Sequence, residues 1–184
     1  EVGGDLIGNA RWVGYPLRDL LAMAGPSSEA DMVLSRSEDG FTAGTPLQAL
    51  TDDRGALLAV GMDGRPLPVE HGYPARMVVP GLYGYVSATK WVVSLEVTRF
   101  DRATAYWTER GWAEKGPIKT GSRIDVPRSG DTVGRGRVTV AGVAWAQGRG
   151  INAVQIRVDD GPWQAATVLA PDMLDAWRLW RWTW

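Results

Sequence analysis

The spacing of hydrophobic residues changes several times along the first hundred positions. From Leu17 to Ala24 apolar side chains recur at helical spacing, and Gly25 follows where helices commonly end. A second, shorter helix is predicted around residues 45–52. The glycine-rich stretch before Pro16 is predicted to be a loop that leads into the first helix.

Three apolar runs between these elements are typical of strands. They occupy residues 31–41, 56–62 and 91–100, with turn-forming Asp-Gly pairs at 39–40 and 63–64. In the last run Val93, Leu95 and Val97 alternate with polar residues, which predicts one buried and one solvated face. Residues 1–100 are therefore predicted to form a mixed α/β unit of the α+β class.

The second half of the chain has a different pattern. Four short strand-like runs, separated by glycine-containing turns, fill residues 121–184 and predict an antiparallel β-sandwich without helices. Arg178 and Arg181, which lie between the terminal tryptophans, are predicted to form the polar face of the last strand. Residues 101–120 are predicted to connect the two halves, with Tyr106, Trp107 and Trp112 pinning the link to a surface.

Composition excludes several kinds of chemistry. The formal net charge of −1 argues against a nucleic-acid partner. With no cysteine, the chain can form no disulfide, iron–sulfur cluster or thiolate metal site, and its single histidine makes a metal held by protein ligands unexpected. No run of 18 apolar residues is present that would span a membrane.

One irregular stretch, residues 66–91, gathers most of the candidate chemistry. Prolines at positions 68, 74 and 80, together with several glycines, predict a tightly specified loop around a brief strand. The loop carries His71, Arg76, Ser87, Thr89 and Lys90, a set of cations and hydroxyl donors that suits an anionic ligand. On spacing alone, a lone histidine is more often a structural residue, and a lysine before tryptophan is often only solvated.

The segment HGYPARMVVPGLYG…KW resembles a motif of the sulfite oxidase family of molybdopterin enzymes. The matched positions are His71, Gly72, Pro74, Arg76, Pro80, Gly81, Gly84, Lys90 and Trp91. The resemblance implies that His71, Arg76, Ala88, Thr89 and Lys90 contact the pterin and phosphate of Mo-molybdopterin, with Ser87 a weaker candidate. It implies no metal ligand in this chain.

Other segments resemble the same family. ARWVGYPLRDLL, at residues 10–21, is similar to an element that follows the molybdenum-ligating cysteine, which would then lie upstream of Glu1. Phe41 takes the position of a family tyrosine near the metal, so the ring is kept and the hydroxyl is lost. Residues 121–184 resemble the start of the family's immunoglobulin-like dimerisation domain, after a partial molybdopterin-binding domain at 1–100.

The resemblance implies a fragment of an oxidoreductase that transfers an oxygen atom on a small anionic or oxo substrate. The parent is expected to be an enzyme, to use an unidentified electron acceptor, and to form a homodimer through the immunoglobulin-like domain. Bacterial relatives work mainly in the cell envelope or periplasm. This chain alone, without the cysteine, is expected to have no catalytic residue and not to retain the cofactor. The alternative is a non-catalytic binding or assembly module, with a degenerate cofactor domain and a β-sandwich interface.

Overall fold

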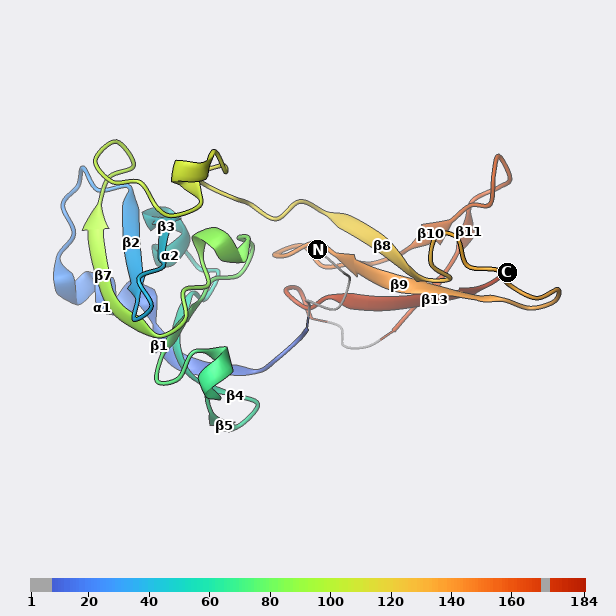
Figure 1. The fold of residues 1–184 in the computed structure, drawn as a ribbon, viewed down its shortest axis with the longest axis horizontal. Coiled ribbons are helices and arrows are strands. Elements are labelled where there is room, and N and C mark those ends of the chain that lie inside the picture. Colours follow the sequence, from blue (N-terminus) through green and yellow to red (C-terminus); the bar gives the residue numbers. More distant parts are fainter. Residues whose placement is uncertain (1–7, 170–172) are drawn as a thin grey trace. The chain divides into compact units, whose positions relative to one another are not determined.

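The computed structural model describes residues 8–169 and 173–184, which fold as two compact units. The first unit runs from Ala10 to Ile118, and the second comprises Lys119–Trp184 together with Gly8 and Asn9. Strands far outnumber helices, so the fold is mostly β with few helices (Figure 1). Within the described ranges, no helix has the length and apolar character needed to cross a membrane.

Two antiparallel sheets form the first unit. In one, β4 (Leu57–Met62) pairs with β1 (Trp12–Pro16), β5 (Arg65–Pro66) and β6 (Arg76–Val78). The other has the order β3 (Thr42–Pro46), β2 (Met32–Ser37), β7 (Val92–Thr98). The helices are α1 (Leu17–Ala24) and α2 (Leu47–Thr51), with 3-10 turns η1 (Val69–His71), η2 (Gly84–Val86) and η3 (Thr108–Arg110). Both predicted helices and all three predicted strands are therefore present, whereas β3 lies where no strand was predicted.

The core of the first unit joins helices and sheets. Leu17 and Leu21 of α1 are buried, as their helical spacing predicts, and they belong to one cluster with Leu50 of α2, Val33 of β2 and Met77 of β6. Gly25 ends α1 in the left-handed conformation, with its N–H donating to the carbonyl of Ala22. The core thereby holds the short strand β6, and with it the loop that carries the candidate site.

The prediction that the residues before Pro16 form only a loop is wrong, because Trp12–Pro16 forms β1. Gly14 makes this possible: a Cβ there would lie 2.2 Å from the carbonyl oxygen of Leu58 on β4. The strands approach so closely at this irregular register that only glycine fits. The earlier part of the predicted loop, residues 1–7, lies outside the described residues.

The predicted alternation in β7 is wrong at Val93, whose side chain is 58% exposed. The register between β2 and β7 shifts between Arg36 and Ser37, so that Ser37 faces Val92. This irregularity turns Val92 toward the main core, while Leu95 and Val97 pack there as predicted.

Residues 101–118, predicted to be a connector, lie in the first unit. The N–H of Ile118 donates to the carbonyl of Gly81 at 2.9 Å, and the Tyr85 hydroxyl donates to the carbonyl of Ala113 at 2.8 Å. These bonds fasten the stretch to the second half of the 66–91 loop.

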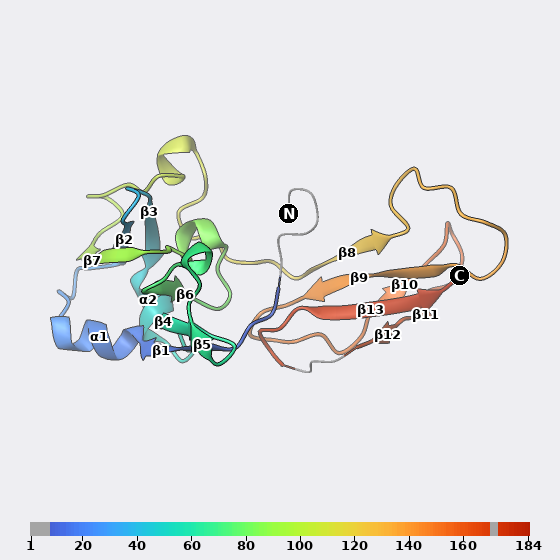
Figure 2. The same ribbon diagram turned by 60° about the horizontal axis from the view of Figure 1, so that its bottom comes forward.

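The second unit is built on one antiparallel sheet. Its order is β12 (Thr167–Val168), β13 (Arg178–Thr183), β9 (Thr139–Trp145), β8 (Gly121–Val126), and Figure 2 shows β13 beside β9. A small hairpin, β10 (Gln155–Ile156) with β11 (Gln164–Ala165), forms a separate pair. Ile151, Val154 and Ile156 pack on a cluster of Val140, Ala144 and Trp180. The predicted short strands and antiparallel pairing are present, and no helix occurs among the described residues of this unit.

Only one of the two arginines predicted for the polar face of the last strand lies there. Arg181 is exposed, but Arg178 is 8% exposed, and its Nε donates to the carbonyl of Leu169 at 2.9 Å. Residues an odd number of positions apart on a strand project to opposite faces. The prediction that Arg178 lies on the polar face with Arg181 is therefore wrong.

Candidate functional site

The candidate site residues of the 66–91 loop meet around one glycine. Gly72, at the end of η1, has a φ of 108°. A Cβ at this position would lie 3.0 Å from the Cβ atoms of both Arg76 and Lys90. The structure therefore brings these two side chains together beside His71, whose own side chain is exposed on η1.

Arg76 is a partly buried cation that bonds only to carbonyl oxygens. Its guanidinium donates to the carbonyls of His71 (3.2 Å), Met77 (3.4 Å) and Ala88 (3.5 Å), and it lies over the ring of Trp12, 5.0 Å from the ring centroid. Burial lowers the pKa of Arg76. No carboxylate of the described residues pairs with it.

Three consecutive backbone amides follow in the same loop. Ala88 donates its N–H to Gly84 at 2.9 Å, but the N–H groups of Thr89, Lys90 and Trp91 donate to no acceptor in the described parts of the chain. Trp91 has a φ of 49°, which is uncommon for a residue other than glycine. Successive free amides in such a turn are typical of anion-binding concavities.

The hydroxyl groups of this loop face inward. Thr89 is fully buried, with Oγ1 2.7 Å from the Oγ of Ser35. Ser87 is also buried, and its Oγ lies 2.9 Å from the carbonyl oxygen of Tyr83 and 3.3 Å from that of Leu82. Both hydroxyls therefore serve the fold, and Thr89 offers a ligand its amide rather than its side chain.

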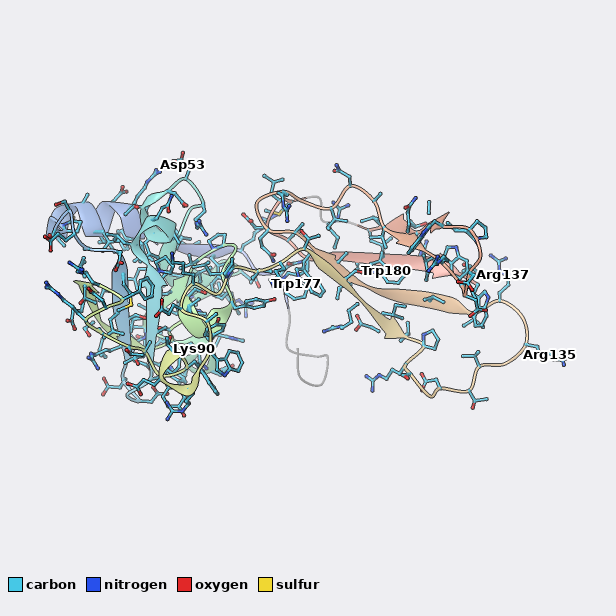
Figure 3. The ribbon with its side chains drawn as sticks, turned by 90° about the horizontal axis from the view of Figure 1, so that it is seen from above. Asp53, Lys90, Arg135, Arg137, Trp177 and Trp180 are labelled. Atoms are coloured by element: carbon cyan, nitrogen blue, oxygen red, sulfur yellow. The ribbon has the colours of Figure 1, made fainter. Side chains whose placement is uncertain are left out.

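Lys90 is held in place rather than loosely solvated. Its Nζ donates to the carbonyl of Glu70 at 2.9 Å and lies 4.2 Å from the centroid of the Trp91 ring (labelled Lys90 in Figure 3). The N–H of Phe41, with a smaller contribution from the Lys90 charge, lowers the pKa of Asp39. The ammonium group is thus one fixed positive charge at the loop.

A groove of about 600 Å³ adjoins the loop. It is lined by Glu38, Asp39, Tyr73, Pro74, Trp91, Val92 and Val93. Its walls are largely apolar, and its two acidic side chains repel an anion. The groove therefore does not suit an anionic ligand. Among the described residues of the loop, the donors that suit an anion are Arg76, Lys90 and the three free amides.

Phe41 contributes a ring without a polar group. Its centroid lies 5.8 Å from that of Tyr106, and the guanidinium of Arg110 lies 3.6 Å from the centroid of the Tyr106 ring.

The sequence did not predict two features of the site, the contact of Trp12 with Arg76 and the free amide of Trp91. The first depends on sheet pairing and the second on a backbone torsion angle, and neither has a sequence pattern.

No group of three or more His, Cys, Asp or Glu side chains in the described ranges is arranged to hold a metal ion. The residues present instead fit the phosphate end of an organic cofactor. The guanidinium of Arg76, which has no carboxylate partner among the described residues, and the nearby free amides match phosphate oxygens in charge and in hydrogen-bonding capacity.

Comparison with known proteins agrees with this chemistry. Residues 1–107 match the model of the oxidoreductase molybdopterin binding domain. The chain is 33% identical to the mitochondrial sulfite oxidase of Macaca fascicularis and 32% identical to that of Homo sapiens. Both alignments cover 95% of this chain and 38% of the relative, so the chain spans well under half of these proteins.

A bacterial relative and a solved structure extend the comparison. The uncharacterized oxidoreductase YuiH of Bacillus subtilis is 34% identical over 105 residues, which are 57% of this chain and 52% of that protein. The sulfane dehydrogenase SoxCD from Paracoccus pantotrophus matches with a TM-score of 0.74 at 26% identity, over 95% of this chain and 48% of that one. The protein belongs to the family of oxidoreductases with a molybdopterin-binding domain, the family of the sulfite oxidases.

Proposed function

We propose that this chain is part of a Mo-molybdopterin-dependent oxidoreductase that transfers an oxygen atom on a small anionic oxo substrate. The names of its relatives, sulfite oxidase and sulfane dehydrogenase, point to small sulfur compounds. The observation that carries the proposal is Arg76, a partly buried cation without a carboxylate partner in the described residues, beside three free amides.

Each residue of the cluster has a distinct part in holding the cofactor. Arg76 and the amides of Thr89, Lys90 and Trp91 would bind the phosphate, because charge-assisted donors match its oxygens. Lys90, His71 and the backbone of Ala88 would orient the pterin. When bound, the cofactor's molybdenum supplies the two-electron chemistry. Glycine at 72 keeps the space between Arg76 and Lys90 open.

On this proposal, Phe41 would line the substrate pocket without a side-chain hydrogen bond. Its ring packs on Tyr106 and can exclude water, but it cannot hold or move a proton. Substrate oxygens would therefore have to be held by other donors. This favours a substrate whose turnover does not depend on a hydroxyl at position 41.

We also propose that the second unit is an immunoglobulin-like domain through which the protein forms a homodimer. Its short antiparallel strands and the exposed apolar side chains of Trp163, Leu179 and Trp184 support this role. A non-catalytic binding module is the second candidate. The exposed rings of Tyr83, Tyr106 and Trp112 on the first unit favour it, since aromatic residues are enriched at interfaces.

Residue-resolved titration tests the cofactor proposal. In ¹⁵N-labelled protein, a pterin phosphate should shift the amide resonances of residues 89–91 in a saturable way. Arg76→Gln should abolish these shifts, whereas Arg65→Gln, an exposed position on β5, should leave them unchanged. Shifts that are absent, or equal in both variants, would exclude this cluster as the phosphate site and favour the binding module.

A further inference from the structure

One face of the sheet in the second unit carries a compact polar cluster. On β13, Arg181 is the cross-strand partner of Thr167, and Thr183 is the partner of Thr139. Direct antiparallel partners project to the same face with Cβ atoms about 5 Å apart, and residues two apart on a strand lie about 7 Å apart. The guanidinium and three hydroxyl-bearing side chains therefore share one small area.

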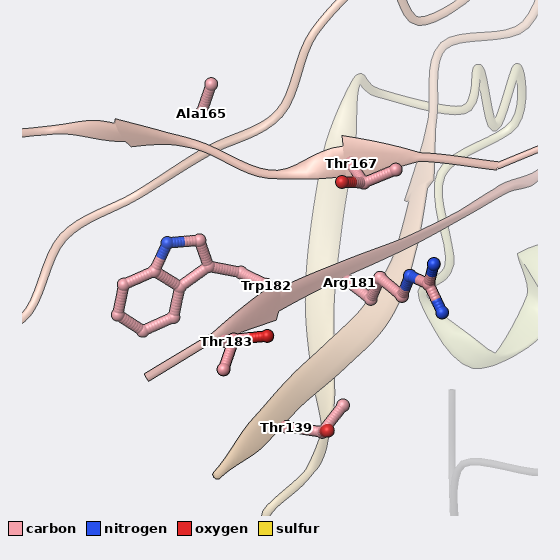
Figure 4. Close-up of a pocket in the computed structure, with 6 residues that line it drawn as sticks. All are labelled: Thr139, Ala165, Thr167, Arg181, Trp182 and Thr183. Carbon is pink, nitrogen blue, oxygen red and sulfur yellow. The ribbon is translucent and has the colours of Figure 1, made fainter. Parts of the chain in front are cut away.

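The cluster lines a depression of about 420 Å³. Its polar residues are Thr139 of β9, Thr167 of β12, and Arg181 and Thr183 of β13, whose side chains are drawn in Figure 4. Trp182 and Ala165 complete the lining. Trp182 also packs against the core cluster that contains Val140 and Trp180.

The polar groups of the cluster are available to a ligand. Within the described ranges, the Arg181 guanidinium has no hydrogen bond or ion pair, and the hydroxyls of Thr139, Thr167 and Thr183 have no partner. The other arginines of the sheet differ: Arg123 pairs with Asp125 at 2.6 Å. No acidic side chain is among the residues that line the depression.

We infer that this depression binds a tetrahedral oxyanion, either a free dianion such as sulfate or phosphate or the same group on a larger molecule. A guanidinium offers two parallel N–H donors to such a group, and each threonine hydroxyl can add one. A cation is disfavoured, because the only charge in the lining is positive. The inference does not depend on the proposed cofactor function, since it uses residues of the second unit alone.

The test is a titration of the complete isotope-labelled chain with sodium sulfate, followed through the threonine methyl and Arg181 Nε–H resonances. Sodium chloride at equal ionic strength is the reference. Sulfate should produce saturable shifts at Thr139, Thr167 and Thr183, and chloride should not. Methyl phosphate distinguishes the source: saturation by this ester supports a group carried on a larger molecule, and saturation by sulfate alone supports a free ion.

Three variants complete the test. Arg181→Gln should weaken binding by about tenfold or more, because a charge-assisted bond is lost. Arg181→Lys keeps the charge but loses the two parallel N–H donors of the guanidinium, so it should weaken binding less than Arg181→Gln. Arg135→Gln, in the exposed loop that joins β8 to β9 (Figure 3), removes the same charge and should leave affinity unchanged. The inference is overturned by shifts that match those in chloride, or by equal affinities of the Arg181 and Arg135 variants for sulfate.

Discussion

The hydroxyl oxygens of Ser35 and Thr89 lie 2.7 Å apart in the interior of the first unit, where neither side chain is exposed. Ser35 also donates its hydroxyl to the carbonyl of Ala43 at 3.1 Å. A hydroxyl has a single hydrogen, so Thr89 must donate to Ser35. This chain of bonds ties the candidate loop to β2 and β3, and it sets the position of the free amides that follow Thr89.

Thr89→Val should therefore loosen the loop. It removes the donor to a buried hydroxyl with little change in shape, which costs about 1–3 kcal/mol. Native-state hydrogen exchange at β2 amides measures the loss. Thr132→Val, at an exposed position in the second unit, is the control and should leave hydrogen exchange at the β2 amides unchanged. In combination with Ser35→Ala, the cost should be less than the sum of the single changes, because both act on one bond. Additive costs would show that the two hydroxyls do not interact.

Gly72→Ala should disrupt the candidate site more than a comparable change elsewhere. Gly72 and Gly64 both have positive φ, 108° and 77°, so alanine is strained at either position. Only at Gly72 would the new methyl meet Arg76 and Lys90, whereas nothing lies within 4 Å at Gly64. Overpacking of this kind adds about 1–3 kcal/mol. Chemical denaturation of the two variants measures the difference, and a pterin phosphate titration should show binding lost only in Gly72→Ala. Equal behaviour would mean that the space around Gly72 is irrelevant.

The turn at Asp39 should open in acid. The N–H of Phe41 donates to the Asp39 carboxylate at 3.0 Å and lowers the pKa of this group below its usual 3.8. A depressed folded pKa stabilises the turn fully above the unfolded value, and the effect is lost as the pH falls through the folded pKa. The Phe41 amide resonance should move across this range below pH 4. Asp39→Asn should remove the transition, and its persistence in that variant would contradict the assignment.

The chain by itself should carry no molybdenum after purification. It has no cysteine, and its five methionines are thioethers, which are weak ligands for an oxidised, hard metal centre. The phosphate cluster holds only one end of the cofactor, so its binding is weak and reversible and the cofactor is not retained through purification. Elemental analysis of the purified chain checks this, and stoichiometric molybdenum would overturn it.

Local patterns predicted much of the fold. The helical spacing that leads to Gly25 specifies α1, and the Asp-Gly pairs at 39–40 and 63–64 specify turns, because each depends on neighbouring residues. Strand β1 and the exposure of Val93 in β7 were missed. Both depend on how closely or in what register another strand approaches, at Gly14 and at Val93, and a sequence pattern does not specify this.

The sequence by itself determined which residues of the candidate site to consider, since His71, Arg76 and Lys90 form a motif within one loop. Tertiary structure decided what each group does. Packing against β2 turned the Thr89 hydroxyl inward, and the backbone conformation left the amides of residues 89–91 without acceptors. The physical reason is that a side chain's chemistry is local, whereas its direction and its partners depend on segments that are distant in the sequence and meet only in the folded chain.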